Sequence, residues 1–90
     1  MNKMELVAEL ARRVGLTKKQ ANMVIDELVD LIKDELRRGR SVRLIGFGTF
    51  TVRQRAARKG RNPRTREEIT IPARKVPVFK PSNQLKEIVR

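Results

Sequence analysis

Apolar side chains recur at helical spacing over the first 39 residues of the chain. The first run follows Asn2 and Glu5, a pair that predicts a helix N-cap with its reciprocal partner. Gly15 predicts the end of this helix, and Thr17, with glutamine three residues later, predicts the capping box of a second helix. The second helix is predicted to run to Arg38 with a broad apolar stripe. The stripe comprises Ala21, Val24, Ile25, Leu28, Leu31, Ile32 and Leu36.

Beyond Gly39, which predicts the end of the second helix, the apolar pattern changes from helical to alternating. Residues 41–44 and 49–52 are predicted to be strands. Two glycines bracket Phe47 between these strands, which predicts a tight turn or bulge with a close backbone approach. The three phenylalanines fall at predicted strand positions, so we expect them to anchor one small core. They are Phe47, Phe50 and Phe79.

Alternation resumes at 69–71 and again at 76–78, which predicts a third strand. Pro77 lies within it, and because proline has no N–H for the ladder, we expect this strand to lie at the edge of the sheet. Ser82 predicts the N-cap of a short final helix. Its apolar residues are Leu85, Ile88 and Val89.

These elements predict a single α+β domain. It has an N-terminal α-hairpin over 1–39 that serves dimerisation, a three-stranded antiparallel sheet over 40–52 and 75–81, a long β-ribbon arm over 53–74, and a short C-terminal helix over 82–90. The apolar material exceeds what so short a chain can bury, so we expect an obligate dimer with a shared core. The residues expected in that core are Leu28, Leu31, Ile32, Leu36, Leu44, Phe47, Phe50 and Phe79.

The charge of the chain is concentrated in one segment. The net charge is +12, and residues 53–80 hold ten basic and two acidic side chains. Fourteen of the 22 basic residues are arginines, whose planar guanidinium groups suit bidentate hydrogen bonds to phosphate and insertion into the minor groove. A concentrated basic field of this kind predicts a polyanionic partner.

Residues 53–74 hold few apolar side chains and form an excursion between two strands. Two extended legs of about ten residues, meeting at Asn62-Pro63, would reach about 30 Å from the body. Such a ribbon is marginal in water, so we expect it to be mobile until it meets a partner. The alternative is that these residues form only a solvated basic loop. We favour an arm that binds nucleic acid. For Pro63, an ordinary turn residue and a wedge that enters a base step both remain open.

Other functional classes find less support in the residues. The chain has no Cys and no His, which removes thiolate sites and the commonest general base. The Gly46–Thr51 segment lacks the third glycine of a phosphate loop and precedes a strand, so we expect neither an enzyme nor a cofactor. The acidic residues between 26 and 35 are interpreted as a solvated helix face, and we expect no metal site. With no apolar run of eighteen residues and no export signal, we expect a cytosolic protein without membrane contact.

Two other nucleic-acid readings differ in the element that binds. Residues 10–21 fit a helix-turn-helix whose second helix begins with Lys18 and Lys19. The second helix is long and has a broad apolar surface, however, and both properties favour a plain α-hairpin. Sequence-specific RNA binding commonly uses exposed aromatic side chains, whereas the three phenylalanines are expected to be buried. RNA would therefore bind only through charge.

Four motifs define a family resemblance: G-F-G-T-F at 46–50, A-A-R-K-G-R-N-P at 56–63, I-P-A-R-K-V-P-V-F-K-P at 71–81, and the opening M-N-K. Together they resemble the bacterial HU family of histone-like DNA-bending proteins, to which integration host factor is closely related. The resemblance covers essentially the whole chain without gaps. It implies an intertwined dimer whose two β-ribbon arms grip the minor groove, with the proline at each tip inserted between base pairs.

The resemblance also implies roles for matching residues. Pro63 matches the intercalating proline. Arm positions near the groove and phosphates are matched by Arg55, Arg58, Lys59, Arg61, Asn62 and Arg64. The basic saddle is matched by Arg53, Lys75 and Lys80, and body positions near flanking DNA by Lys3, Lys18 and Lys86. We add Arg66 to the arm and Arg74 to the body of this predicted set.

Two positions depart from the family pattern. Arg66 stands where many relatives have glycine, which adds a charge and leaves the backbone conformation of the tip open. Ser82-Asn83 stands where many relatives have Gly-Lys, which removes one expected phosphate contact. The resulting hypothesis is a dimeric nucleoid protein, paired with itself or with a sister subunit. It binds double-stranded DNA with low sequence specificity through the minor groove, and bends and compacts it.

Overall fold

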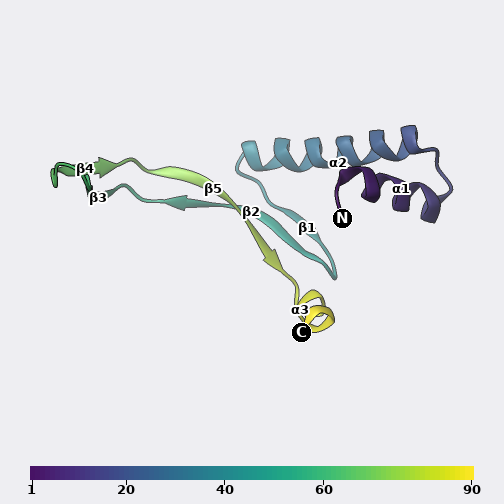
Figure 1. The fold of residues 1–90 in the computed structure, drawn as a ribbon. Helices are drawn as coiled ribbons and strands as arrows, with labels where there is room; N and C mark the ends of the chain where they lie inside the picture. Colours follow the sequence, from purple (N-terminus) through teal and green to yellow (C-terminus); the bar gives the residue numbers. More distant parts are fainter. The chain divides into compact units, whose positions relative to one another are not determined.

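Figure 1 shows the computed structural model, which describes residues 1–90 as two helices, five strands and a final helix. The chain divides into two compact units, Met1–Asp34 and Glu35–Arg90. None of its helices combines the length and the apolar character that crossing a membrane requires. The α+β class and the order of helices and sheet strands agree with the sequence-based prediction.

The two N-terminal helices begin at the predicted caps. Helix α1 spans Lys3–Val14, and the Asn2 side chain accepts a hydrogen bond from the Glu5 N–H at 2.9 Å. Helix α2 spans Lys18–Arg37. The Thr17 N–H donates to the side chain of Gln20 at 3.0 Å, and the Gln20 N–H donates to the Thr17 hydroxyl at 3.1 Å. Both groups of the predicted second capping box are therefore satisfied.

Both helices end at glycines in the left-handed conformation. Gly15 has φ +71° at the end of α1, and Gly39 has φ +76° after α2. The Arg40 N–H donates to the Glu35 carbonyl at 2.9 Å and the Gly39 N–H donates to the Leu36 carbonyl at 3.0 Å. These bonds form a Schellman motif, which ends α2 at Arg37, one residue before the predicted end.

The core of the first unit is small. Val7, Ala11 and Ala21 are buried, and Leu10 and Ile25 pack against them. The expected core residues further along α2 stay open to solvent in the single chain. Leu28 is 48% exposed and Leu31 is 61% exposed, while Ile32 and Leu36 are half-buried.

The second unit contains all the strands. They are β1 (Val42–Leu44), β2 (Gly48–Arg55), β3 (Arg58–Arg61), β4 (Glu68–Ile71) and β5 (Arg74–Pro81). Strands β1, β2 and β5 form an antiparallel sheet in the order β1-β2-β5, and β3 pairs with β4 in a two-stranded ribbon. The prediction that the proline-containing strand lies at an edge is confirmed. Strand β2 is longer than predicted and pairs with β5 beyond the end of β1.

The register is continuous from the sheet into the ribbon. Arg55 faces Arg74 at the end of the β2–β5 ladder, and Arg58 faces Ile71 at the start of the β3–β4 ladder. Two residues separate the ladders on each side, so the same pairing frame holds across the break. Pro72, which has no N–H to donate, lies within this break. The excursion is thus the far end of one long hairpin, as Figure 1 shows.

The turn between β1 and β2 corrects one prediction. Phe47 lies in a turn and not in a strand: its N–H donates to the Leu44 carbonyl at 3.0 Å, and Gly46 adopts φ +83°. A glycine at the third position of such a turn is favoured because φ is positive there. At Gly48 the backbone of β5 passes so close that an added Cβ would stand 2.6 Å from the Lys80 carbonyl oxygen. The predicted close approach is therefore confirmed.

The phenylalanines form one cluster, as expected. Ring centroids lie 5.2 Å apart for Phe47 and Phe79, and 4.8 Å apart for Phe50 and Phe79. Helix α3 spans Asn83–Val89, and the hydroxyl of its N-cap, Ser82, accepts from the Leu85 N–H at 3.1 Å. The Ser82 N–H donates to the Phe47 carbonyl at 2.9 Å, which ties the start of α3 to the β1–β2 turn.

Candidate nucleic-acid interface

The pairing register sorts the side chains of the sheet onto two faces. Paired residues share a face, and successive residues along a strand alternate between faces. One face carries apolar groups, with Val42, Phe50 and Phe79 in one row. We call the other side the basic face. Its residues are Arg43, Thr49, Lys80, Thr51, Val78, Arg53, Val76, Arg55 and Arg74.

The basic face holds no Asp or Glu, and none of its cations forms an ion pair. The ion pairs of the chain lie elsewhere, for example Lys3 with Asp26 at 2.6 Å and Arg40 with Glu35 at 2.6 Å. Cations without protein partners keep their full field and their hydrogen-bond donors for a ligand. A carboxylate-free cationic face is suited to a polyanion.

Arg55 and Arg74 face each other directly across the β2–β5 ladder. Like charges in directly opposite positions destabilise a strand pair. Both arginines, with Arg53 and Arg58, line a groove of about 440 Å³ at the break between the two ladders. The fold therefore gathers four guanidinium groups where the free protein gains nothing from them. A bound polyanion would replace the repulsion among these guanidinium groups with attraction to its own negative charges.

The register separates one predicted saddle residue from the others. Lys75 faces Gln54 and lies on the apolar side of the sheet, whereas Arg53 and Lys80 lie on the basic face. The sequence motif placed all three in one group because it carries no information on which face each occupies. Arg74, which directly precedes Lys75, lies on the basic face.

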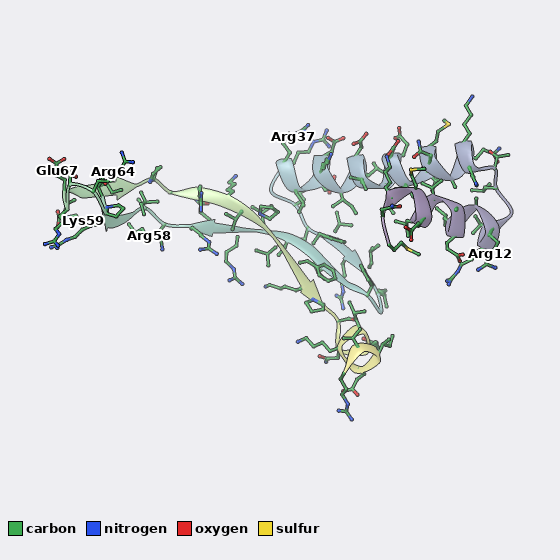
Figure 2. The ribbon with its side chains drawn as sticks, in the orientation of Figure 1. Arg12, Arg37, Arg58, Lys59, Arg64 and Glu67 are labelled. Atoms are coloured by element: carbon green, nitrogen blue, oxygen red, sulfur yellow. The ribbon has the colours of Figure 1, made fainter.

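Strands β3 and β4 continue the alternation toward the tip. Lys59 faces Thr70, and Arg61 faces Glu68. On the other side Gly60 faces Ile69, and an added Cβ at Gly60 would lie 3.2 Å from the Ile71 side chain. One side of the ribbon therefore carries Lys59, Arg61 and Glu68, and the other carries Arg58 with the apolar side chains of Ile69 and Ile71. Figure 2 shows Lys59, Arg64 and Glu67 around the end of the hairpin, with Arg58 nearer its base.

The loop at the tip is closed by hydrogen bonds around Asn62. Its N–H donates to the Glu67 carbonyl at 2.9 Å, and its own carbonyl accepts from the Arg66 N–H at 2.8 Å. The Asn62 side chain accepts from the Arg64 N–H at 2.9 Å, which forms an Asx turn. Pro63 stands exposed between these bonds. It begins the loop and does not form its midpoint, which corrects the prediction that the two legs meet at Asn62-Pro63.

Arg66 adopts φ +59°, and it is the one residue other than glycine with a positive φ. A left-handed conformation costs a residue with a Cβ about 1–2 kcal/mol. The backbone at this family departure thus takes a conformation that glycine adopts without strain. The exposed arginine side chain is added to the cationic tip at that cost.

Three of the predicted body contacts, Lys3, Lys18 and Lys86, lie outside this sheet. Lys3 is paired with Asp26, and Lys3, Lys18 and Lys19 line a groove of about 340 Å³ in the first unit. Lys86 is exposed on α3. No group of three or more His, Cys, Asp or Glu side chains could hold a metal ion. One cation of the basic face, Arg43, was absent from the predicted set. The sequence did hold a signal for it, because Arg43 lies between Val42 and Leu44 in an alternating strand and so must face away from their apolar side.

Comparisons with known proteins place this geometry in a family. A family model described as bacterial DNA-binding protein matches residues 1–90. DNA-binding protein HU of Geobacillus stearothermophilus is 56% identical over 90 residues, which is the whole of both chains. The HU chain of an Anabaena HU–DNA cocrystal structure superposes with a TM-score of 0.91 at 44% identity, covering 99% of this chain and 97% of that one. HU from Thermotoga maritima gives a TM-score of 0.73 at 31% identity, with both chains fully covered.

Proposed function

The chain belongs to the bacterial DNA-binding protein family, and from this premise we propose that it is a histone-like protein of the nucleoid that binds and bends double-stranded DNA. The observation that carries the proposal is the carboxylate-free basic face of the sheet, whose pairing frame continues into the arm. Its cations are unpaired in the free protein, so DNA phosphates are the partners that complete them.

Low sequence specificity follows from the composition of this interface. Arginine and lysine on a sheet and a ribbon contact phosphates and the minor groove, where the pattern of donors and acceptors distinguishes base pairs poorly. If about six to ten phosphates are neutralised, log K falls with log salt at a slope of about −5 to −9. RNA enters this proposal only as a ligand bound through charge.

We assign the wedge role to Pro63. Its ring is exposed, and the bonds from Asn62 to Arg64, Arg66 and Glu67 hold the loop that presents it. A rigid apolar ring at the end of a cationic ribbon can enter a base step, and unstacking that step kinks the duplex toward the major groove. The remaining predicted arm residues position the ribbon along the groove.

We further propose that the functional unit is an intertwined dimer, of two copies or of this chain with a sister subunit. Support comes from the apolar side chains that a single chain leaves exposed, since Leu31 is 61% exposed and Phe47 is 44% exposed. Residues 1–39 and the apolar face of the sheet would supply the shared core. A melting temperature that rises with protein concentration is expected for such a dimer. A concentration-independent melting temperature and a monomeric mass in sedimentation would contradict it.

Energy transfer between the labelled ends of a short duplex tests the proposed bending. The protein is expected to bring the ends together, and Pro63→Ala is expected to reduce the bend more than the affinity. Pro77→Ala is the matched control, because it removes the same ring from the sheet and leaves the tip unchanged. Equal bending by Pro63→Ala and the unsubstituted protein would refute the wedge. Loss of binding only on replacing Lys18 and Lys19 would instead favour the helix-turn-helix.

A further inference from the structure

The basic face ends in an outer row of side chains at the end of the sheet away from the arm. This row contains a cation that no family motif identifies. Arg43 of β1 faces Thr49 of β2, and Thr49 faces Lys80 of β5. The three side chains therefore lie in one row across all three strands. Neighbouring strands lie about 4.8 Å apart, so the two cations flank the threonine at a span of about 10 Å.

The groups in this row lack partners within the protein. Arg43 and Lys80 are exposed and form no ion pair, whereas Arg40, three residues earlier, is bound to Glu35 at 2.6 Å. The Thr49 hydroxyl makes no hydrogen bond, in contrast to the Thr51 hydroxyl in the next row, which is 2.8 Å from that of Ser41. The row thus presents two cations and a free hydroxyl donor together.

The surface beside the row is concave and contains no carboxylate. A groove of about 600 Å³ is lined by Arg43, Thr49 and Lys80, and by Gly46 of the adjoining turn. An added Cβ at Gly46 would meet no atom within 4 Å, so a ligand can approach the turn closely, and Arg, Lys and Thr are all common donors to phosphate oxygens. Guanidinium and ammonium groups bind phosphate by charge-assisted hydrogen bonds.

We propose that Arg43, Thr49 and Lys80 form a phosphate-binding row that holds the backbone of the bound duplex on the sheet, outside the arm. This inference deepens the proposed function and rests on it. Arg43 is the new member and acts as an additional DNA-contact residue. It extends the basic face from the two strands of the hairpin to the outer strand β1.

The test compares the salt dependence of duplex binding by Arg43→Gln and by Arg40→Gln, which loses the same charge from an ion-paired arginine. In a dimer that uses both rows, Arg43→Gln is expected to reduce the slope of log K against log salt by about 1.8. Its affinity deficit then shrinks about 12-fold between 50 and 200 mM salt. Arg40→Gln is expected to keep the original slope, and Arg43→Lys is expected to restore it.

An unchanged slope for a folded Arg43→Gln protein would overturn the inference. If that variant does not fold, modification of arginines by phenylglyoxal in the unsubstituted protein gives the answer, read by mass spectrometry. DNA is expected to protect Arg43 more than Arg40, and equal modification of both would overturn the inference. Failure of the unsubstituted protein to bind DNA with a steep salt slope would contradict the proposed function itself. Steep binding without a role for Arg43 would contradict only this inference.

Discussion

Replacing Arg74 by glutamine is expected to order the free arm and to weaken DNA binding in the same molecule. Arg74 faces Arg55, and directly opposite side chains have Cβ atoms about 4.5–5.5 Å apart. Two unit charges about 7 Å apart in water repel by about 0.6 kcal/mol. Salt at 0.15 M screens part of this repulsion, because the Debye length is then about 8 Å. The substitution should therefore stabilise the free hairpin by about 0.3–0.6 kcal/mol.

The same substitution removes one phosphate contact from each arm. In a dimer with both arms bound, the slope of log K against log salt should fall by about 1.8. Lys75→Gln is the control, because the adjacent residue loses the same charge but faces Gln54 on the apolar side of the sheet. Amide hydrogen exchange of β2 and β5 at low salt measures the order of the free arm, and DNA titrations at several salt concentrations measure the slope. Faster exchange in Arg74→Gln, or equal slopes for the two variants, would refute the assignment of faces.

Four further substitutions test the local geometry. Gly48→Ala should destabilise the protein by about 1–3 kcal/mol because its Cβ would stand 2.6 Å from a backbone oxygen and an aromatic ring. Gly60→Ala, whose Cβ would meet a flexible side-chain end at 3.2 Å, should change stability by less than about 0.5 kcal/mol, and thermal melts at one protein concentration compare the two. Arg66→Gly should order the free tip by about 0.5–1 kcal/mol and slow exchange of the Asn62 amide, since the relief of left-handed strain exceeds the added chain entropy. Thr17→Ala should cost about 1 kcal/mol of unfolding free energy through loss of the α2 cap, and an unchanged melt would contradict the capping geometry.

The predictions that were confirmed depend on short stretches of chain. The caps at Asn2 and Thr17 join residues three apart, and the helix ends at Gly15 and Gly39 need only a positive φ. The edge position of the strand with Pro77 follows from the missing N–H of one residue. Local chemistry of this kind is legible in a sequence because the interacting groups are neighbours along it.

The features that were missed depend on pairing between distant residues. Whether Lys75 or Arg74 joins the basic face is decided by register with β2, some twenty residues earlier. The length of β2 was underestimated because its outer half carries charged side chains whose partners lie on β5. Phe47 was assigned to a strand because a phenylalanine between glycines fits either a strand or a turn until the hydrogen bond from its N–H is known. The shared core involves a partner chain, which no pattern within one chain specifies.

The central claim is that the arms bind DNA by bending it. It is tested most directly by comparing affinity for an intact duplex with affinity for the same duplex carrying a nick or a gap. Bending a site of this kind costs a few kcal/mol by elastic estimates, and a nick or gap removes part of that cost. Markedly tighter binding to the nicked duplex is the predicted result, with the difference reduced in Pro63→Ala. Equal affinity for the intact and nicked duplexes would contradict the account, and would indicate that the basic face binds DNA by charge alone, without bending it.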